Sequence, residues 1–326
     1  MSSFASSAPP VLRLLAAAKI NLHLRIGPRR EDGFHSLLSW MATIGLFDSL
    51  SLTASSVETD GNGVVLSCDD PALPCDGRNL VVKAARLFRE RRSADSQGKV
   101  ADGNSPGGNV SIHLEKRIPA GGGLGGGSSD AARTLLGLNR LWGQSAESPA
   151  IGARCLSELG LSLGSDVPFF LYGPSSVCKG RGEAVVPIGA PRSAQWVTLV
   201  LPPIGMPTAD VYRRFDEMGL GRVQDLEEQP AWDQWVAMDS AALLPLLVND
   251  LEAPAFSLRP ELGQLRESLE ETTGRPVRMS GSGSSLFTLF DERDEAIDAA
   301  QRIVAVNGVR AIAVELAPTV ADDLAL

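Results

Sequence analysis

Alternation of apolar and polar residues predicts a strand near the start of the chain. Between positions 20 and 26, apolar side chains occupy every second place, and polar residues fill the places before and between them: Lys19, Asn21, His23 and Arg25. Because successive side chains of a strand point to opposite faces, this pattern predicts a half-buried strand with a polar face. The stretches 51–55, 63–68 and 109–118 predict further short strands, and 29–34 predicts a turn.

A spacing of three to four residues between apolar side chains predicts helices elsewhere. Residues 79–92 place four apolar side chains on one helical face, with Asn79 as the N-cap. Residues 128–143 carry a similar stripe, with Ser128 or Ser129 as the N-cap. Further helices are predicted at about 149–159, 209–219, 241–248, 261–271 and 295–306, and further strands at 195–203, 276–290 and 310–316.

The order of these elements predicts an α+β sandwich with two domains, 1–190 and 191–326. Residues 93–108 are polar and glycine-rich, which predicts a disordered surface insert. Residues 221–239 are acidic and irregular, and we assign them only to the surface. The leader before Arg13 has no positive charge ahead of its apolar stretch, so we do not expect a signal peptide.

Composition narrows the classes of function. The chain has 326 residues, 44% hydrophobic and 21% charged, as in ordinary globular proteins. A net charge of −9 without a basic patch argues against binding nucleic acid. The sequence has no run of about 18 apolar residues, so we expect no membrane span. The four cysteines lack CxxC spacing and the three histidines are scattered, which argues against a zinc site and favours a cytoplasmic protein. A monomer and a homodimer both remain open.

The stretch "IPAGGGLGGGSSDAA", residues 118–132, lies between a predicted strand and a predicted helix. The first turn of a helix has backbone N–H groups without partners and carries a partial positive charge. Glycine lets the preceding backbone approach an anion closely, because no Cβ stands in the way. We therefore predict a cradle for polyphosphate, to which Ser128 and Ser129 add hydroxyls that could face phosphate or a metal ion.

Other interpretations of the glycine run fit less well. A flexible linker would lack the flanking strand and helix. Gly121, Gly123 and Gly126 satisfy the G-x-G-x-x-G pattern of dinucleotide sites, but the lead-in "LEKRIPA" is charged and broken by proline. A Walker A loop would end in G-K-[ST], and no lysine stands there. A lysine that neutralises phosphate must therefore come from another segment.

The glycine run resembles the nucleotide loop of the GHMP kinases, a superfamily of small-molecule kinases. Six other blocks resemble, in the same order, the branch of this superfamily whose acceptor is 4-diphosphocytidyl-2-C-methyl-D-erythritol: "AAAKINLHLRI", "RREDGFHSL", "LGSDVPFFLYG", "CKGRGE", "NDLEAPAF" and "MSGSGSSLF". The resemblance runs from Ala16 to Phe290. It implies a ribosomal-protein-S5-like N-terminal domain, a ferredoxin-like C-terminal domain, and ATP with Mg²⁺. The implied reaction is phosphorylation of the 2-hydroxyl of that acceptor, in non-mevalonate isoprenoid precursor biosynthesis.

The resemblance also implies roles for single residues. Lys19 matches the catalytic lysine and Asp166 the general base; without the resemblance, they fit an exposed strand lysine and a helix N-cap. The ATP loop comprises Pro119, Ala120, Gly121, Gly122, Gly123, Leu124, Gly125, Gly126, Gly127, Ser128 and Ser129. It implies no particular metal ligands.

Substrate contacts are implied at four positions: Asn21, Phe34, His35 and Tyr212. The two rings would stack on cytosine, although Phe34 stands where the family commonly has tyrosine and Tyr212 where it has phenylalanine. Tyr212 also fits a core aromatic on a helix. The turn from Gly281 to Ser285 fits a β-hairpin, a wall of the active site, or both. We expect His23 and His113 on the surface.

Two other functions stay open on sequence grounds. One is a GHMP kinase with another acceptor, such as homoserine or a polyol. The other is a non-catalytic nucleotide-binding relative, which would be expected to lose Lys19 or Asp166, yet this chain keeps both. A dinucleotide-dependent oxidoreductase is a distant further alternative, for the loop reasons given above.

Overall fold

Two long antiparallel strands form the frame of the protein, which we describe from a computed structural model. The structure describes residues 11–55, 63–95, 108–145 and 148–324. β1 (Val11–Arg29) pairs along its length with β2 (His35–Ser55), joined by the predicted turn. Residues 1–10 of the leader and residues 96–107 of the predicted insert lie outside the described residues.

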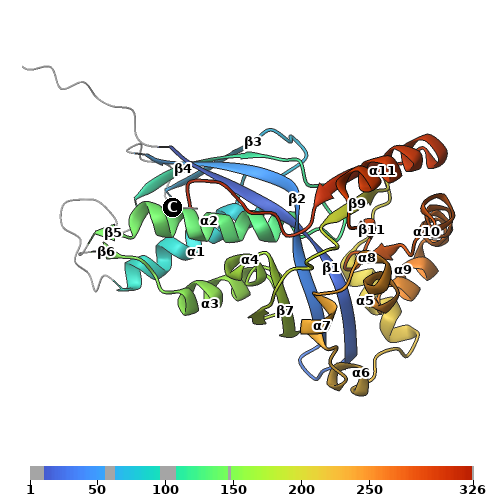
Figure 1. Cartoon of the computed structure of the whole chain (residues 1–326). Coiled ribbons are helices and arrows are strands. Elements are labelled where there is room, and N and C mark those ends of the chain that lie inside the picture. Colours follow the sequence, from blue (N-terminus) through green and yellow to red (C-terminus); the bar gives the residue numbers. More distant parts are fainter. Residues whose placement is uncertain (1–10, 56–62, 96–107, 146–147, 325–326) are drawn as a thin grey trace, which may run out of the picture.

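The first half of the chain builds a six-stranded sheet covered by helices on one face (Figure 1). Its strands run in the order β3-β4-β2-β7-β8, with β1 beside β2; the remaining bounds are β3 (Val64–Cys68), β4 (Asn109–Glu115), β7 (Ser175–Gly180) and β8 (Ala184–Pro187). The covering helices are α1 (Leu80–Asp95), α2 (Gly126–Trp142), α3 (Ala153–Leu163) and the short α4 (Phe169–Tyr172). A small hairpin, β5 (Gln144–Ser145) and β6 (Ser148–Pro149), follows α2.

The second half builds a four-stranded antiparallel sheet in the order β10-β11-β9-β12, with helices packed against it (Figure 1). Its strands are β9 (Trp196–Leu201), β10 (Arg278–Met279), β11 (Leu286–Phe290) and β12 (Arg310–Glu315). The helices are α5 (Thr208–Glu217), α6 (Gln224–Glu227), α7 (Trp232–Trp235), α8 (Ser240–Leu243), η1 (Leu244–Leu246), α9 (Glu252–Leu258), α10 (Pro260–Thr273) and α11 (Arg293–Asn307).

The two halves share buried apolar side chains. Ile20 of β1 and Trp40 of β2 pack in one cluster with Leu199 of β9 and Phe287 of β11. The boundary predicted after residue 190 falls between β8 and β9, and the division into two domains stays a prediction.

Several element bounds differ from the sequence predictions. α2 begins at Gly126, with Gly125 in the left-handed region as its N-cap, so the N-cap predicted at Ser128 or Ser129 is wrong. The Asn79 cap is confirmed, because its Oδ1 accepts a hydrogen bond from the backbone N–H of Val81. α3 begins at Ala153, later than predicted. The sequence analysis predicted no helix where α9 lies.

The polar face of β1 is buried, which contradicts the half-buried strand that its alternation predicts. Lys19, Asn21 and His23 are each no more than 4% exposed. Segments far along the chain cover them, and periodicity within one strand carries no information about such partners.

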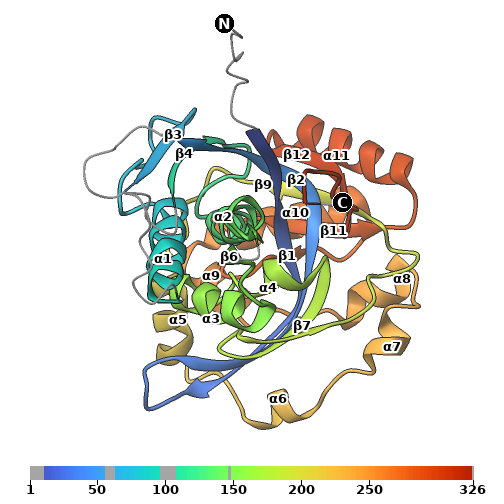
Figure 2. The same cartoon turned by 90° about the vertical axis from the view of Figure 1, so that its left-hand side faces the viewer.

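The free edge of β1 is bonded to segments that are not strands. Three of its N–H groups donate to backbone or hydroxyl oxygens of loops: that of Lys19 to Leu124, that of Asn21 to Ser280 and that of Leu24 to Val248. Three more donate to carboxylates: that of Ile26 to Asp250, that of Leu15 to Asp322 and that of Arg13 to Asp323. An uncovered edge strand would expose such groups. Figure 2 shows β1 and β2 side by side with α2 seen end-on beside them.

The segment 221–239 contributes to the core, so its assignment to the surface alone is wrong. Trp232 lies edge-on to Trp40, with ring centroids 5.9 Å apart, and Val236 is buried. His23 packs edge-on against Trp232 and Trp235, and the expectation of a surface histidine is wrong there. Burial, followed by the charge of Arg25, lowers the pKa of His23 to about 4.

His113 is exposed, as predicted. Within the part of the chain that the structure describes, no helix has the length and apolar character needed to cross a bilayer.

Candidate active site

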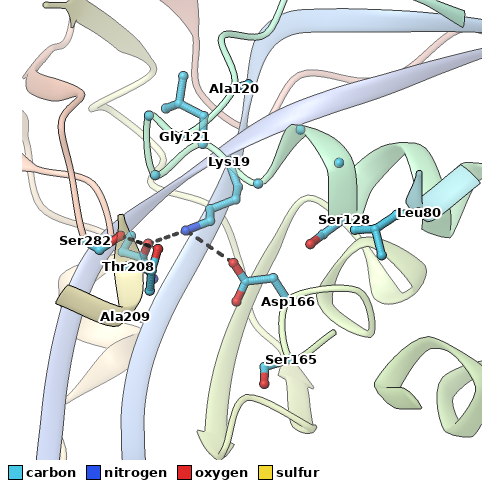
Figure 3. Close-up of a pocket in the computed structure, with 18 of the residues that line it drawn as sticks. Lys19, Leu80, Ala120, Gly121, Ser128, Ser165, Asp166, Thr208, Ala209 and Ser282 are labelled. Carbon is cyan, nitrogen blue, oxygen red and sulfur yellow. Dashed lines mark hydrogen bonds and ion pairs between the residues drawn. The ribbon is translucent and has the colours of Figure 1, made fainter. Parts of the chain in front are cut away.

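A cavity of about 1050 Å³ lies where the two halves of the chain meet. The glycine-rich loop, β1, the segment around Asp166, the start of α5 and the turn at Gly281 all line it. In Figure 3 the side chains of Lys19 and Asp166 point toward each other beneath Gly121, with Ser128 to one side and Thr208 to the other. Segments from five places in the sequence therefore converge on one hollow.

The glycine-rich loop rests against the second glycine turn of the sequence. Ser280 Oγ donates to the carbonyl oxygen of Gly123 at 3.0 Å, and the N–H of Ser285 donates to that of Gly122 at 3.2 Å. Gly123 has φ +75°, and a Cβ there would lie 2.2 Å from the carbonyl oxygen of Ser280. The glycines thus permit close packing of two backbones as well as an approach to an anion.

The turn itself is a β-hairpin, because β10 and β11 pair across it. Both roles considered for Gly281 to Ser285, hairpin and wall of the site, hold together, since Gly281 and Ser282 line the cavity.

Lys19 and Asp166 form an ion pair at the centre of the cavity, 3.5 Å apart. The Lys19 side chain is 4% exposed and that of Asp166 34%, so the lysine is fixed and the carboxylate faces the open space. Lys19 Nζ also donates to Asn21 Oδ1 at 2.5 Å, and Asn21 Nδ2 donates to Ser39 Oγ at 2.8 Å. The amide of Asn21 therefore orients the ammonium group.

A buried charge cluster fixes both ends of the loop. Asp48 of β2 accepts hydrogen bonds from the backbone N–H groups of Arg117 and Ile118, where the loop begins. Lys116 Nζ contacts Asp48 and donates to Asp130 of α2 at 2.9 Å. Burial, only partly offset by Lys116, raises the pKa of Asp130 to about 7.

One end of the cavity is aromatic and charged. Phe34, His35 and Tyr212 line it, and the His35 and Tyr212 ring centroids are 5.2 Å apart. The Arg181 guanidinium lies 3.5 Å above the Phe34 ring. Phe34 is 46% exposed, so one face of an aromatic ring is available to a planar ligand.

The opposite end of the cavity is largely apolar. Leu73, Pro74, Leu80, Leu114 and Ile118 contribute to it, together with Asn79 and Arg78. In Figure 3, Leu80 lies on one side of Lys19 and Asp166, and Thr208 of α5 lies on the other.

The structure brings the predicted site residues together with one exception. Lys19, Asn21, Phe34, His35, Asp166 and Tyr212 line one cavity with residues 119–128. Ser129 does not line it, and its Oγ is buried in the described structure without a hydrogen-bond partner. The Asp166 N-cap alternative is wrong, because the following helix has Pro168 as its N-cap.

The lining residues that sequence reasoning missed include Arg181, Thr208 and Asp216. Arg181 stands in the "CKGRGE" block, whose glycines could have indicated a turn near the site. Asp216 carries no such signal, because only the packing of α5 against the start of β2 brings it to the cavity.

Among the described residues no group of three or more His, Cys, Asp or Glu could hold a metal ion. The Ser128 hydroxyl and the Asp166 carboxylate do face the cavity. Mg²⁺ is commonly held by one or two protein oxygens plus substrate phosphates, so this donor set fits it.

The fold and this cavity define the architecture of a GHMP kinase. The profile described as "GHMP kinases N terminal domain" matches residues 79–174, and "GHMP kinases C terminal" matches residues 236–307. A crystal structure of homoserine kinase from Cytophaga hutchinsonii superposes with a TM-score of 0.64 at 16% identity, over 96% of this chain and 97% of that one. At that identity the likeness concerns the fold alone.

Relatives of higher identity give the particular family. A 4-diphosphocytidyl-2-C-methyl-D-erythritol kinase from Nocardioides sp. is 38% identical over 86% of this chain and 89% of its own. One from Shouchella clausii is 37% identical over 85% of both chains. A crystal structure of 4-(cytidine 5'-diphospho)-2C-methyl-D-erythritol kinase superposes with a TM-score of 0.71 at 36% identity, covering 94% of this chain and 100% of that one. The chain belongs to the 4-diphosphocytidyl-2-C-methyl-D-erythritol kinase family of GHMP kinases.

Proposed function

We propose that the protein transfers the γ-phosphoryl group of ATP to the 2-hydroxyl of 4-diphosphocytidyl-2-C-methyl-D-erythritol, in non-mevalonate isoprenoid precursor biosynthesis. The observation that carries the proposal is the Lys19–Asp166 pair, 3.5 Å apart, beside the glycine-rich loop in a cavity with a planar-ligand end. Phosphoryl transfer depends mainly on positioning and charge stabilisation, which these parts supply.

The polyphosphate of ATP would lie along the glycine-rich loop. Residues 121–128 line the cavity, and the N-terminus of α2 adds unpaired N–H groups and a partial positive charge. The apolar end beyond the loop, near Leu80 and Leu114, would hold the nucleoside.

Asp166 would accept the proton of the acceptor hydroxyl. Its carboxylate is open to the cavity, whereas Lys19 is buried and fixed by Asn21. The ammonium group of Lys19 would stabilise the negative charge that develops near the acceptor oxygen and the transferred group. Because the two groups already form an ion pair, little rearrangement is needed before reaction.

The Ser128 hydroxyl and the Asp166 carboxylate would hold Mg²⁺ with the phosphates of ATP. When bound, Mg²⁺ neutralises phosphate charge.

The aromatic end would hold the cytosine. Phe34 and Tyr212 would offer ring faces, and His35 lines the cavity beside Tyr212. Burial, followed by the charge of Asp166, raises the pKa of the Tyr212 hydroxyl, so that this group stays neutral. We expect the reaction to take place in the cytoplasm, in keeping with four cysteines that are all free thiols.

A coupled ADP-release assay tests the proposal. We expect turnover of the diphosphocytidyl substrate and none of homoserine or mevalonate. Asp166→Asn should lower kcat by roughly 10²–10⁴-fold, the range for a lost general base. The exposed Asp233→Asn is the matched control and should keep full activity. Equal activity on homoserine, or a normal kcat for Asp166→Asn in a folded protein, would contradict the proposal.

A further inference from the structure

Asn249 is a buried amide that is bonded at both of its polar ends. It lies in the segment between η1 and α9 and is 5% exposed. Its Nδ2 donates to the carbonyl oxygens of Met279 at 2.7 Å and Gly281 at 2.8 Å. Its Oδ1 accepts from the backbone N–H of Leu251 at 2.9 Å. A side-chain amide has two hydrogens to donate, and here both go to one short piece of backbone where the second glycine turn begins.

The backbone around Asn249 is itself anchored to β1. The N–H of Leu24 donates to the carbonyl oxygen of Val248 at 2.7 Å, and the N–H of Asp250 donates back to that of Leu24 at 3.0 Å. Asn249 thereby pairs with Leu24 as a short parallel bridge. Lys19 stands on the same strand, five residues before Leu24. The amide of Asn249 therefore ties the second glycine turn to the strand that carries the lysine.

The second glycine turn packs against the ammonium group of Lys19. Gly281 has φ +56°, and a Cβ there would lie 3.2 Å from Asn21 Oδ1 and 3.4 Å from Lys19 Nζ. The backbone of Gly281 therefore rests against the hydrogen bond between Lys19 and Asn21. In Figure 3, Ser282, the next residue of the turn, lies on the side of Lys19 away from Asp166. The turn thus supports the lysine from behind, as seen from the carboxylate.

The same turn also contacts the glycine-rich loop. Ser280 stands between the two carbonyl groups that Asn249 binds. Its Oγ donates to the carbonyl oxygen of Gly123 at 3.0 Å and accepts from the backbone N–H of Asn21 at 3.3 Å. Asn249 does not line the cavity itself. It nevertheless fixes a turn that touches the glycine-rich loop on one side and Lys19 on the other.

We propose that Asn249 is a positioning residue for phosphoryl transfer. By binding the carbonyl groups of Met279 and Gly281, it holds the second glycine turn where Lys19 stays directed at Asp166. This inference rests on the proposed function, since it assumes that Lys19 acts in the transfer. It gives a role to the block "NDLEAPAF", to which we assigned none from the sequence.

Asn249→Asp tests the proposal in the full-length protein. The carboxylate has the size of the amide but no hydrogen to donate, so it would face two carbonyl oxygens without a bond. A displacement of about 1 Å can cost a factor of about 100 in rate, so we expect kcat to fall roughly 10- to 100-fold. KM for ATP should rise, because Ser280 moves with the turn. KM for the acceptor should change less than about twofold, because the aromatic end is untouched.

A merely structural role predicts a different result. Loss of folded protein lowers the apparent kcat and leaves both KM values unchanged. Asn139→Asp is the matched control, since Asn139 also donates to a carbonyl oxygen and accepts from an N–H, both of Ile151, away from the cavity. It should lose stability in urea unfolding and keep kcat and both KM values. Normal kcat and KM for ATP in folded Asn249→Asp, or an equal loss of kcat in Asn139→Asp, would overturn the inference.

A second pair of variants leaves Asn249 in place and decides the question if Asn249→Asp does not fold. Gly281→Ala adds a methyl group against Lys19 and Asn21. Gly274→Ala adds one at a similar φ, +66° against +56°, where no heavy atom lies within 4 Å. Gly281→Ala should have a kcat at least about tenfold below that of Gly274→Ala. Equal kcat values for these two variants would overturn the inference.

Failure of the proposed function is recognised separately. The unaltered protein would then show no turnover of the diphosphocytidyl acceptor, whereas failure of the inference appears only in the comparison between variants.

Discussion

Gly123 lies where two backbone turns meet, and its lack of a side chain is required by its neighbour as well as by its own conformation. Gly121, two residues earlier, has almost the same φ, +74° against +75°. No heavy atom lies within 4 Å of the Cβ position at Gly121, whereas the Ser280 carbonyl oxygen lies 2.2 Å from that at Gly123. Substitutions at Gly121 and Gly123 can therefore separate the free-energy cost of a left-handed conformation from that of a steric clash.

We therefore expect different outcomes for the two alanine variants. Gly121→Ala should lose about 1–2 kcal/mol of unfolding free energy, the cost of a left-handed alanine. Gly123→Ala should lose at least about 1 kcal/mol more, because the loop must move away from Ser280. Urea unfolding measures both values, and KM for ATP should rise more for Gly123→Ala. Equal losses would show that the two turns do not depend on their close contact.

The cluster of Asp48, Lys116 and Asp130 joins three elements: β2, the segment after β4, and α2. Its members are nearly inaccessible, with side-chain exposures of 0%, 9% and 3%. Two carboxylates share one ammonium group there, and one oxygen of Asp130 has no hydrogen-bond partner in the described structure. The cluster aligns the glycine-rich loop with α2, and it does so with one negative charge that is poorly compensated.

This imbalance makes stability depend on pH. The pKa of Asp130 is raised to about 7 in the fold, above its ordinary value of 3.8, so the folded state binds the proton more tightly. The stability that protonated Asp130 contributes is lost as pH rises from about 4 to about 7, at up to about 1.4 kcal/mol per pH unit. Asp130→Asn should flatten this part of the curve, measured by urea unfolding at each pH. A slope identical to that of the unaltered protein would contradict the expectation.

Elements with a strong local period were predictable, and their surroundings were not. The alternation around Ile20 reflects the apolar face of β1, and the strand that it predicts is present. Its polar face is buried by residues such as Ser280, which lies 259 residues beyond Asn21. Contacts between segments far apart in the sequence also explain why we wrongly expected His23 on the surface and why we missed Asp216. The family resemblance identified Lys19 and Asp166. No local sequence pattern predicts that these two residues lie close together.

Across the whole molecule, the end of the chain returns to its beginning. Asp322 forms a buried ion pair with Arg133 of α2 and accepts a hydrogen bond from the backbone N–H of Leu15. Asp323 accepts from the N–H of Arg13, and Leu324 packs against the core of the first half. The last described residues thereby hold α2 against the start of β1.

Removing the ion pair should weaken the fold as a whole. Asp322→Ala leaves Arg133 with an uncompensated, mostly buried charge, so we expect a loss of about 3–5 kcal/mol in unfolding free energy. Asp323→Ala, whose side chain is exposed, is the control and should cost no more than about 1.5 kcal/mol. Differential scanning calorimetry of both variants measures the difference. Similar melting temperatures for the two would argue that the C-terminal segment contributes little.

The strand that carries Lys19 has its outer edge completed by loops from the middle of the chain and by carboxylates from its end. During synthesis on a ribosome, β1 is made long before Asp322 and Asp323, which bond the backbone N–H groups at its start. A nascent chain that stalls before Asp322 therefore holds β1 with open backbone donors. Synthesis through residue 323, and not merely of the first half, is what closes that edge.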